Sequence, residues 1–285
     1  MLVVFCNIMH INCICIPRHK SILSDVKEQQ YEINLKTRAQ LIESMPKSKR
    51  DKFNAKGPLA WYFLEPLYSC EDTVRLGDVV GDGSKYMCNL EHLKQHTRCV
   101  YYGFGVNNNI VFDQALRKAL PHCEMHMFDP SEPAHTPEII AKVASLNATF
   151  HTGYGLSAVD GPLDIGNLAG TKLLGKSLAT IQRELGHAGR PIDVFKIDIE
   201  GGEYPVFHSL LENCDRQTPF AHQIEVEFHM INGIDGKGFL KLANKLLDCG
   251  YRPFAKDVNL YCPDCMEYGL VHENFIKCMD INVDE

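Results

Sequence analysis

The sequence predicts an α/β fold built on one mostly parallel β-sheet, with helices on both faces and one antiparallel strand near an edge. Two observations lead to this prediction. From Arg98 onward, short β-type runs alternate with segments of helical spacing, and this alternation is typical of parallel βαβ units. At the C-terminus the alternation stops, and residues 252–262 and 274–279 are expected to form two consecutive strands. Two such strands allow an antiparallel strand at that edge of the sheet.

The alternating part of the chain contains five expected strands and five expected helices. Apolar, β-branched or aromatic runs that end in Gly, Asp or Pro predict the strands, at 98–105, 123–130, 147–157, 192–201 and 221–230. Apolar residues at helical spacing predict the helices, at 110–120, 137–146, 177–186, 203–214 and 236–251.

The N-terminal part is expected to differ from the rest. Residues 1–56 are predicted to be an apolar segment, a helix and a charged linker, and residues 57–285 the main domain. The apolar start, up to Pro17, resembles a signal peptide only weakly, because no Lys or Arg precedes it and polar residues interrupt it. Membrane association is expected only if this segment is an anchor, and both a cytoplasmic and a secretory-pathway location stay open.

Composition argues against nucleic acid as a partner and does not decide whether the cysteines are reduced or bonded. The net charge is −7, so there is no basic field for nucleic acid, and none is expected as a partner. Twelve cysteines permit either reduced thiols or a few disulfides. If the chain is exported, Cys70 and Cys88 are the expected bridge. Cys262 and Cys265, with Cys249 and Cys278, could bind zinc, but disulfides or buried thiols are favoured because the spacing is not that of paired C-x-x-C motifs.

A glycine turn after the first strand of the alternating part marks the expected ligand site. The stretch YYGFGVNNN places Gly103 and Gly105 between a strand and a helix, with Asn108 where a dinucleotide fingerprint has its third glycine. Asp129 ends the next strand, where a carboxylate can accept hydrogen bonds from ribose hydroxyls. The alternative is a tight turn into a helix without a ligand.

The asparagines that follow the turn favour one cofactor over another. Asn107 and Asn108 supply amide groups where a pyrophosphate site would have glycine, and Asn109 supplies a possible helix cap. Amides suit an amino-acid moiety, which carries a carboxylate and an ammonium, better than a diphosphate. The turn therefore favours S-adenosylmethionine over NAD.

Carboxylates follow the strand at 192–201, where the sequence reads FKIDIEGGEYPVF. Asp198 and Glu200 lie at the strand end, and His229 ends the next strand, so the three are predicted to meet in one pocket as catalytic residues. A carboxylate or His within reach of an acceptor hydroxyl can take its proton. Glu203 is explained by the helix macrodipole alone. A divalent cation held by these acids is the less favoured alternative, because no tight ligand spacing is present, and no metal site is predicted.

Four segments resemble the FkbM-type S-adenosylmethionine-dependent methyltransferases. They read VYYGFGVNNNIVFDQAL, HMFDPS, IDVFKIDIEGGEYPVF and QIEVEFH, and the resemblance covers roughly residues 60–280. The branch that includes methyltransferase-like protein 24 is the most similar. The resemblance implies a class I methyltransferase (Rossmann-like) fold of seven strands, the last of them inserted antiparallel. It also implies that Gly103 and Gly105 line the cofactor turn.

The resemblance assigns further positions. It places Asp129 on the ribose, Asp160 near the adenine, and Asp198 and Glu200 beside the methyl group. Asp113 departs from the branch, which more often has a glutamate there, and this puts in doubt any contact that needs the longer side chain. The acceptor implied by the family is a hydroxyl on a small molecule or glycan.

Three functions therefore stay open on the sequence. The first is an O-methyltransferase that uses S-adenosylmethionine. The second is a nicotinamide-dependent oxidoreductase, against which stand the missing third glycine and the lack of a hydride-site signature. The third is a catalytically inactive binding protein on the same fold, which would keep the glycine turn and Asp129 but would not need Asp198, Glu200 and His229.

Overall fold

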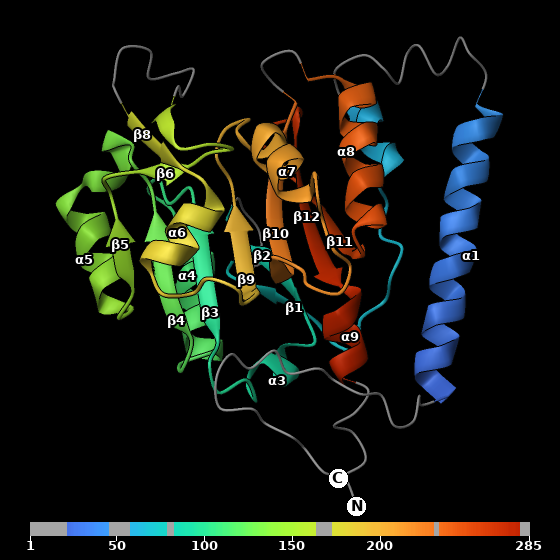
Figure 1. Cartoon of the computed structure of the whole chain (residues 1–285), viewed down its shortest axis with the longest axis horizontal. Helices are drawn as coiled ribbons and strands as arrows, with labels where there is room; N and C mark the ends of the chain where they lie inside the picture. The colour runs from blue at the N-terminus through green and yellow to red at the C-terminus, as the bar shows by residue number, and fades with distance from the viewer. Residues whose placement is uncertain (1–21, 46–57, 79–82, 164–172, 231–233, 280–285) are drawn as a thin grey trace, which may run out of the picture.

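The computed structural model describes residues 22–45, 58–78, 83–163, 173–230 and 234–279 (Figure 1). Its centre is a seven-stranded sheet of order β11-β12-β10-β9-β3-β4-β5. β12 runs antiparallel to both of its neighbours, and the pairs from β10 to β5 are parallel. The predicted fold class is confirmed. The strands are β3 (Val100–Phe104), β4 (Glu124–Phe128), β5 (Thr149–His151), β9 (Ile192–Ile197), β10 (Ala221–His229), β11 (Tyr251–Val258) and β12 (Cys265–His272).

Helices cover both faces of this sheet, because the central strands are apolar on both sides. On one face Phe104, Phe195 and Phe228 pack under α6 (Leu178–Glu184), α7 (Glu203–Leu211), α8 (Gly236–Asp248) and the 3-10 helix η1 (Pro58–Phe63). On the other face Tyr101, Met127 and Val194 pack under α4 (Val111–Ala119), α5 (Pro137–Ser145), α3 (Leu90–Leu93) and α9 (Glu273–Met279).

A hairpin of β1 (Thr73–Leu76) and β2 (Lys85–Cys88) lies against the second face, over β10 and β12. The side-chain amide of Gln223 on β10 holds it, accepting from the Cys88 N–H at 2.9 Å and donating to the Cys88 carbonyl at 2.7 Å. The hairpin brings Lys85 from outside the alternating part of the chain to the middle of the sheet.

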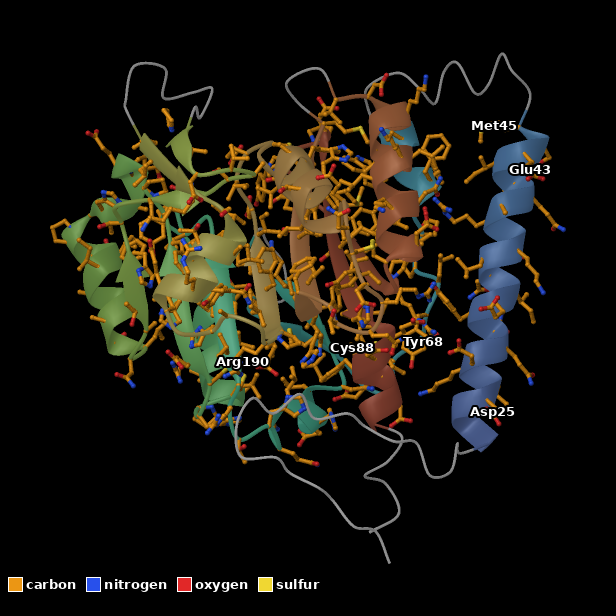
Figure 2. All side chains as sticks on the ribbon, viewed as in Figure 1. Asp25, Glu43, Met45, Tyr68, Cys88 and Arg190 are labelled. Carbon is orange, nitrogen blue, oxygen red and sulfur yellow. A yellow bond between two sulfur atoms is a disulfide. The ribbon has the colours of Figure 1, made fainter. Side chains whose placement is uncertain are left out.

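The N-terminal helix expected from the spacing is α1 (Ile22–Ser44), which lies beside the β11 end of the sheet (Figure 1). It docks through Tyr31, whose ring centroid lies 6.4 Å from that of Tyr68. Tyr68 lies between the helix and the sheet (Figure 2). Arg252 on β11 adds hydrogen bonds of 2.6 and 2.9 Å to Glu28. The apolar start and the charged linker lie outside the described residues. Among the described helices, none is long and apolar enough to span a membrane.

The expectation for the C-terminus is wrong in one element. Residues 274–279 belong to α9, and the last strand is β12, which directly precedes it. The loop between β5 and α6 also forms a small three-stranded sheet of β6 (Gly155–Leu156), β8 (Leu173–Lys176) and β7 (Gly161–Leu163).

Four disulfides join eight of the cysteines in the described part of the chain. Cys70 is bonded to Cys88, the pair expected for an exported protein. The grouping considered for zinc is not formed, since Cys249 is bonded to Cys214, and Cys262 is bonded to Cys265. The remaining pair, Cys99–Cys123, ties the approach to β3 to the approach to β4.

Candidate functional site

The glycine turn and the acidic segment meet at the carboxyl ends of β3 and β9. Gly105 has a φ of +81°, and a Cβ built on it would lie 1.7 Å from the Asp198 carbonyl oxygen. Only glycine fits both the left-handed backbone and this contact. The Asp198 N–H also donates to the Phe104 carbonyl at 3.1 Å. The two segments singled out in the sequence are thus in direct contact.

Gly103 is not part of the turn. It lies within β3, between neighbours on β4 and β9, and a Cβ on it would come within 2.3 Å of the Tyr101 hydroxyl. That hydroxyl donates to the buried Asp113 carboxylate at 2.6 Å. The missing side chain at Gly103 therefore makes room for the Tyr101 ring, and the expectation that Gly103 lines a cofactor turn is corrected.

Asp129 holds the turn in shape. One of its carboxylate oxygens accepts from the backbone N–H groups of Val106 at 2.9 Å and Asn107 at 2.8 Å. The other accepts from the Ser131 N–H at 2.9 Å and the Ser131 hydroxyl at 2.5 Å. A carboxylate offers about four acceptor positions. All four are used within the protein, so a ribose hydroxyl could reach Asp129 only if the Ser131 hydroxyl turned away.

The three asparagines after the turn are placed differently from one another. Asn107 and Asn108 are exposed, and Asn107 has a φ of +44°, a left-handed backbone that asparagine tolerates. The Asn109 side chain accepts from the Val111 N–H at 3.2 Å, at the start of α4. Two exposed amides therefore border the turn. The N-cap position of α4 is Ile110, without a side-chain cap, so Asn109 is not the helix cap that was expected, although it binds the first helical N–H.

The hydrogen bonds of Asp160 are made to residues outside this turn. Its carboxylate accepts from the Ser177 N–H at 2.7 Å and from the Thr180 hydroxyl at 2.7 Å. These hydrogen bonds lower the pKa of Asp160, that from the Ser177 backbone most. The side chain thus joins the loop before β7 to the N-terminus of α6. A contact with adenine stays a prediction.

The Asp198 side chain is the ionised member of a carboxylate pair. Burial opposes its ionisation, but the ammonium groups of Lys196 and Lys85 outweigh burial and lower the pKa of Asp198 below its usual value. Glu227, its cross-strand neighbour, donates a hydrogen bond to it. Burial, and next the charge of Asp198, raise the pKa of Glu227 to about 8. At neutral pH the pair therefore carries one proton, on Glu227.

Lys196 also ties this acid to the turn. The side chain is buried, and its Nζ donates to the Gly105 carbonyl oxygen at 2.5 Å. A cation inside an otherwise apolar strand was visible in the sequence as the Lys in DVFKI. Its partner was not visible, because the turn it binds lies in a different βα unit.

Glu203 makes specific hydrogen bonds in addition to its favourable position at the N-terminus of the helix. Its side chain is fully buried and accepts from the Ile199 N–H at 2.8 Å and the Gly201 N–H at 2.9 Å. It also meets the Nδ1 of His229 at 3.2 Å. Glu203 thus fixes the backbone loop that carries Glu200, whose φ of +56° is unusual for a side-chain-bearing residue.

His229 is protonated at neutral pH. Burial opposes its charge, but the hydrogen bond and charge of Glu203 outweigh burial and raise its pKa to about 10. Its Nε2 lies 3.8 Å from Asp198 and 3.7 Å from Glu200, so the three predicted catalytic residues do converge. At neutral pH this ring therefore contributes a positive charge between the carboxylates around it. Among the described residues, these three are one of two groups here whose atoms lie close enough to hold a metal ion, the other being Glu227, His229 and the disulfide-bonded Cys265.

Further polar and charged residues lie under this end of the sheet, and of these sequence reasoning missed Lys85, Glu267 and Asn259. Lys85 forms a buried ion pair with Glu267 on β12. Burial raises the pKa of Glu225 well above its usual value, so that acid is neutral. Asn259, in the turn between β11 and Cys262, donates to Glu227 at 2.7 Å. Lys85 and Asn259 stand in segments without any local signal of a site, since the fold alone brings them here.

The side chains at this edge fit S-adenosylmethionine. Carboxylates of Asp198 and Glu200 are 23% and 58% exposed beside the turn, where a sulfonium and an ammonium would be stabilised by negative charge. The amides of Asn107 and Asn108 can hydrogen-bond an amino-acid carboxylate. The fit is weakest at Asp129, which already has four donors.

Comparison with known proteins agrees with this fold. A family model described as a methyltransferase domain matches residues 18–272. No curated protein sequence is similar. Solved structures of similar fold include fibrillarin from Aeropyrum pernix with natively bound S-adenosyl-L-methionine, at 10% identity over 62% of this chain and 68% of that one, with a TM-score of 0.38.

The same comparison found two further solved structures. Fibrillarin from Methanococcus jannaschii is 11% identical over 64% of this chain and 68% of its own, with a TM-score of 0.38. The mitomycin 7-O-methyltransferase MmcR is 11% identical over 88% of this chain and 69% of its own, with a TM-score of 0.30. Similarity this low transfers no activity from these proteins to the chain.

Proposed function

This chain belongs to the family of methyltransferase domains whose model matches it, and from that premise we propose that it methylates a hydroxyl oxygen on a small molecule or glycan. Its cofactor is S-adenosylmethionine. We also propose that it lies in the FkbM-type branch, on the strength of the D-x-E-G-x-E segment and the E-x-H that ends the next strand. The acceptor class rests on that resemblance.

The contact between Gly105 and Asp198 carries the proposal. This backbone contact sets Asp198, whose carboxylate is ionised, beside the turn that is proposed to border the cofactor. When bound, S-adenosylmethionine supplies an electrophilic methyl group. In this proposal the Asp198 carboxylate would accept the proton that the acceptor hydroxyl loses. Positioned bases of this kind contribute about 10²–10⁴-fold.

The other predicted residues take supporting roles in the proposal. His229 keeps the negative charges of Asp198 and Glu200 from repelling one another, because its charged ring faces both. Glu200 is the most exposed of the three and is placed to bind an acceptor hydroxyl. Glu203 holds the loop and the ring together. Alignment of acceptor and methyl group is the main task of such a loop, and it can lower the barrier by about 7–11 kcal/mol.

On the cofactor side, Gly105, Asn107 and Asn108 are proposed to border the amino-acid moiety. Asp129 is proposed to act in two ways, holding the turn at all times and taking a ribose hydroxyl when the Ser131 hydroxyl rotates away. Asp160 is proposed to lie near the adenine, through the loop that it ties to α6.

Two measurements test the proposed function. Calorimetry of the purified full chain should detect binding of S-adenosylmethionine and S-adenosylhomocysteine and none of NAD. Incubation with methyl-labelled cofactor and a panel of sugars, phenols and amines should then label only hydroxyl acceptors, as O-methyl products in mass spectrometry. Label on an amine nitrogen would overturn the acceptor class, and cofactor binding without any transfer would favour the inactive binding protein.

A further inference from the structure

A cluster of one glutamate and two histidines lies at the end of the sheet where the parallel strands begin, opposite the proposed methyl-transfer site. Glu124 is the first residue of β4, His126 follows on the same strand, and His187 lies after α6. Figure 2 labels Arg190, three residues after His187, near the lower end of the sheet. The cluster shares no residue with the proposed methyl-transfer site.

Two imidazole nitrogens in this cluster face one carboxylate. The Nε2 of His126 lies 2.9 Å from Oε1 of Glu124, and the Nε2 of His187 lies 3.4 Å from Oε2. All three ligand atoms lie within 4.8 Å of one another. In a tetrahedral site with bonds of about 2.0–2.1 Å, ligand atoms stand about 3.3–3.5 Å apart. Only small side-chain shifts are needed to close the three around one ion.

The other nitrogen of each ring already has a partner. The Nδ1 of His187 lies 2.7 Å from the buried Tyr102 hydroxyl. The Nδ1 of His126 lies 3.0 Å from the Nε2 of His151, whose Nδ1 lies 3.3 Å from the Tyr154 hydroxyl. Histidines that bind metals almost always have such a partner, which fixes the ring and the protonated nitrogen.

Because of these partners, each Nε2 can offer its lone pair to a metal ion while the ring stays neutral and keeps its one proton. Without a metal, each Nε2–H donates to Glu124. With a metal, each ring proton moves to Nδ1. The Nδ1–H of His187 then donates a hydrogen bond to the Tyr102 oxygen, and that of His126 donates one to the Nε2 of His151. The His151 proton then moves to its own Nδ1 and is donated to the Tyr154 oxygen. Each chain of hydrogen bonds simply reverses direction.

We propose that Glu124, His126 and His187 form a binding site for a divalent transition metal ion, with zinc the best match. Two nitrogens and one carboxylate suit zinc and its neighbours, whereas magnesium and calcium prefer oxygen ligands. The histidine side chains are only 7% and 8% exposed, while that of Glu124 is 56% exposed. The fourth position therefore opens to solvent, where a water molecule completes the tetrahedron.

Another carboxylate between two histidines does not meet the same conditions. Asp193 lies 2.9 Å from His96 and 3.3 Å from His222. Its second oxygen, however, accepts from the Val100 N–H at 2.8 Å and lies 3.5 Å from the Arg190 guanidinium. A cation there would lie next to the Arg190 guanidinium, which also acts on His187 but makes its hydrogen bond to Asp193. This group serves as a matched comparison for the proposed site.

The consequence of binding is stability. The ion would join the start of β4 to the segment between α6 and β9, which are more than fifty residues apart in the chain. A ligand that binds only the folded state stabilises it in proportion to the logarithm of its concentration over Kd. Since the proposed methyl-transfer residues lie at the other edge, methyl transfer is not expected to require the ion.

Titration of the chelator-treated full chain with Co²⁺ and Zn²⁺ tests the site. One equivalent of Co²⁺ should give the visible bands of a tetrahedral site, and Zn²⁺ should displace it and raise the Tm. His187→Gln and the more conservative, exposed Glu124→Gln should each weaken binding at least tenfold, with the far-ultraviolet circular dichroism unchanged. Tyr102→Phe, which removes only a partner of a ligand, should weaken it about 10–100-fold.

His222→Gln is the comparison variant and should bind the ion as the wild type does. The proposal is overturned if the wild type binds no Co²⁺ or Zn²⁺, or if Glu124→Gln and His187→Gln bind as the wild type does. It is also overturned if His222→Gln alone abolishes binding. Failure here would leave cofactor binding and methyl transfer unaffected, so the two proposals are tested separately.

Discussion

The Asp198 carbonyl oxygen rests against the α-carbon of Gly105, so close that a Cβ on the glycine would lie 1.7 Å away. This contact joins the turn after β3 to the acidic loop after β9. Gly105→Ala should therefore push the two apart, abolish binding of S-adenosylhomocysteine in calorimetry, and lower the free energy of unfolding in urea.

Gly186→Ala is the matched control for this prediction. Gly186 has a φ of +77°, close to that of Gly105, but no atom lies within 4 Å of its added Cβ. It should cost only the strain of a left-handed backbone, about 1–2 kcal/mol, and leave cofactor binding intact. Equal effects of the two substitutions would show that the contact with Asp198 does not matter.

Asp129→Ala should lower the affinity for S-adenosylhomocysteine at least tenfold. The reason is double, since the change removes an acceptor for ribose and also releases the Val106 and Asn107 N–H groups. Net hydrogen bonds to a charged group contribute about 1.5–3 kcal/mol each. Calorimetry gives the affinity, and urea denaturation the stability.

Ser131→Ala separates the two roles of Asp129. It removes the hydroxyl that occupies one acceptor position and leaves the bonds to the turn in place. If Asp129 binds ribose, the affinity of Ser131→Ala should equal or exceed that of the wild type. Normal affinity in Asp129→Ala would place the ribose elsewhere.

Asp198→Asn should reduce turnover by about 10²-fold or more, because the amide keeps the shape and loses the charge. The affinity for S-adenosylhomocysteine, which lacks the sulfonium charge, should change little. The rate with an identified acceptor is the measurement, and Glu212→Gln, on the surface, is the control. If a cation takes part at this edge, the variant should also respond less to added Mg²⁺ or Mn²⁺. Full turnover in Asp198→Asn would shift the search for the base to Glu200 or Glu227.

His272 should make the protein less stable in mild acid. The side chain is fully buried, with Nε2–H donating to the Cys249 carbonyl at 3.0 Å and Nδ1 accepting from the Asn274 N–H at 3.1 Å. Burial lowers its pKa to about 4, although Glu273 opposes the shift and His222 and Arg216 add to it. The neutral ring is thus favoured in the folded state, and the unfolded chain takes up the proton first, near its ordinary pKa of about 6.5.

The stabilising effect of a lowered histidine pKa is complete above about pH 6.5 and is lost as the pH falls toward 4. The loss should reach about 3 kcal/mol, at 1.36 kcal/mol for each pKa unit. Urea denaturation at pH 7 and pH 4.5 should show a smaller difference for His272→Gln than for the wild type. His208→Gln, at an exposed position, should keep the wild-type difference. A His272→Gln difference equal to that of the wild type would contradict the prediction.

Cys70 and Cys88 should be found as a disulfide in protein made by a secretory host. Their bond closes the hairpin that carries Lys85 onto the sheet. Peptide mass spectrometry without reduction should recover the linked pair. Two free thiols in that material would count against an exported, bridged protein.

The repeating pattern of the chain was enough to predict the order and direction of most of the sheet. Strand–turn–helix alternation requires parallel strands, and this places Gly105, Asp198 and His229 at one edge whatever their side chains contact. The sequence by itself therefore determined the fold class and the convergence of the three predicted catalytic residues.

Only the tertiary structure decided what those residues do, because their partners come from distant segments. The neighbouring Lys196, together with Lys85 from the distant hairpin, keeps Asp198 ionised, and Glu203 reaches His229 and holds it protonated. β12 was missed for the same reason. Glu267 and Gly269 are unusual residues for a buried strand. Lys85 pairs with Glu267, and the Phe254 ring fills the space beside Gly269, 2.6 Å from where a Cβ would be. Local pattern shows the period of an element, whereas charge and shape complementarity exist only once the chain has folded.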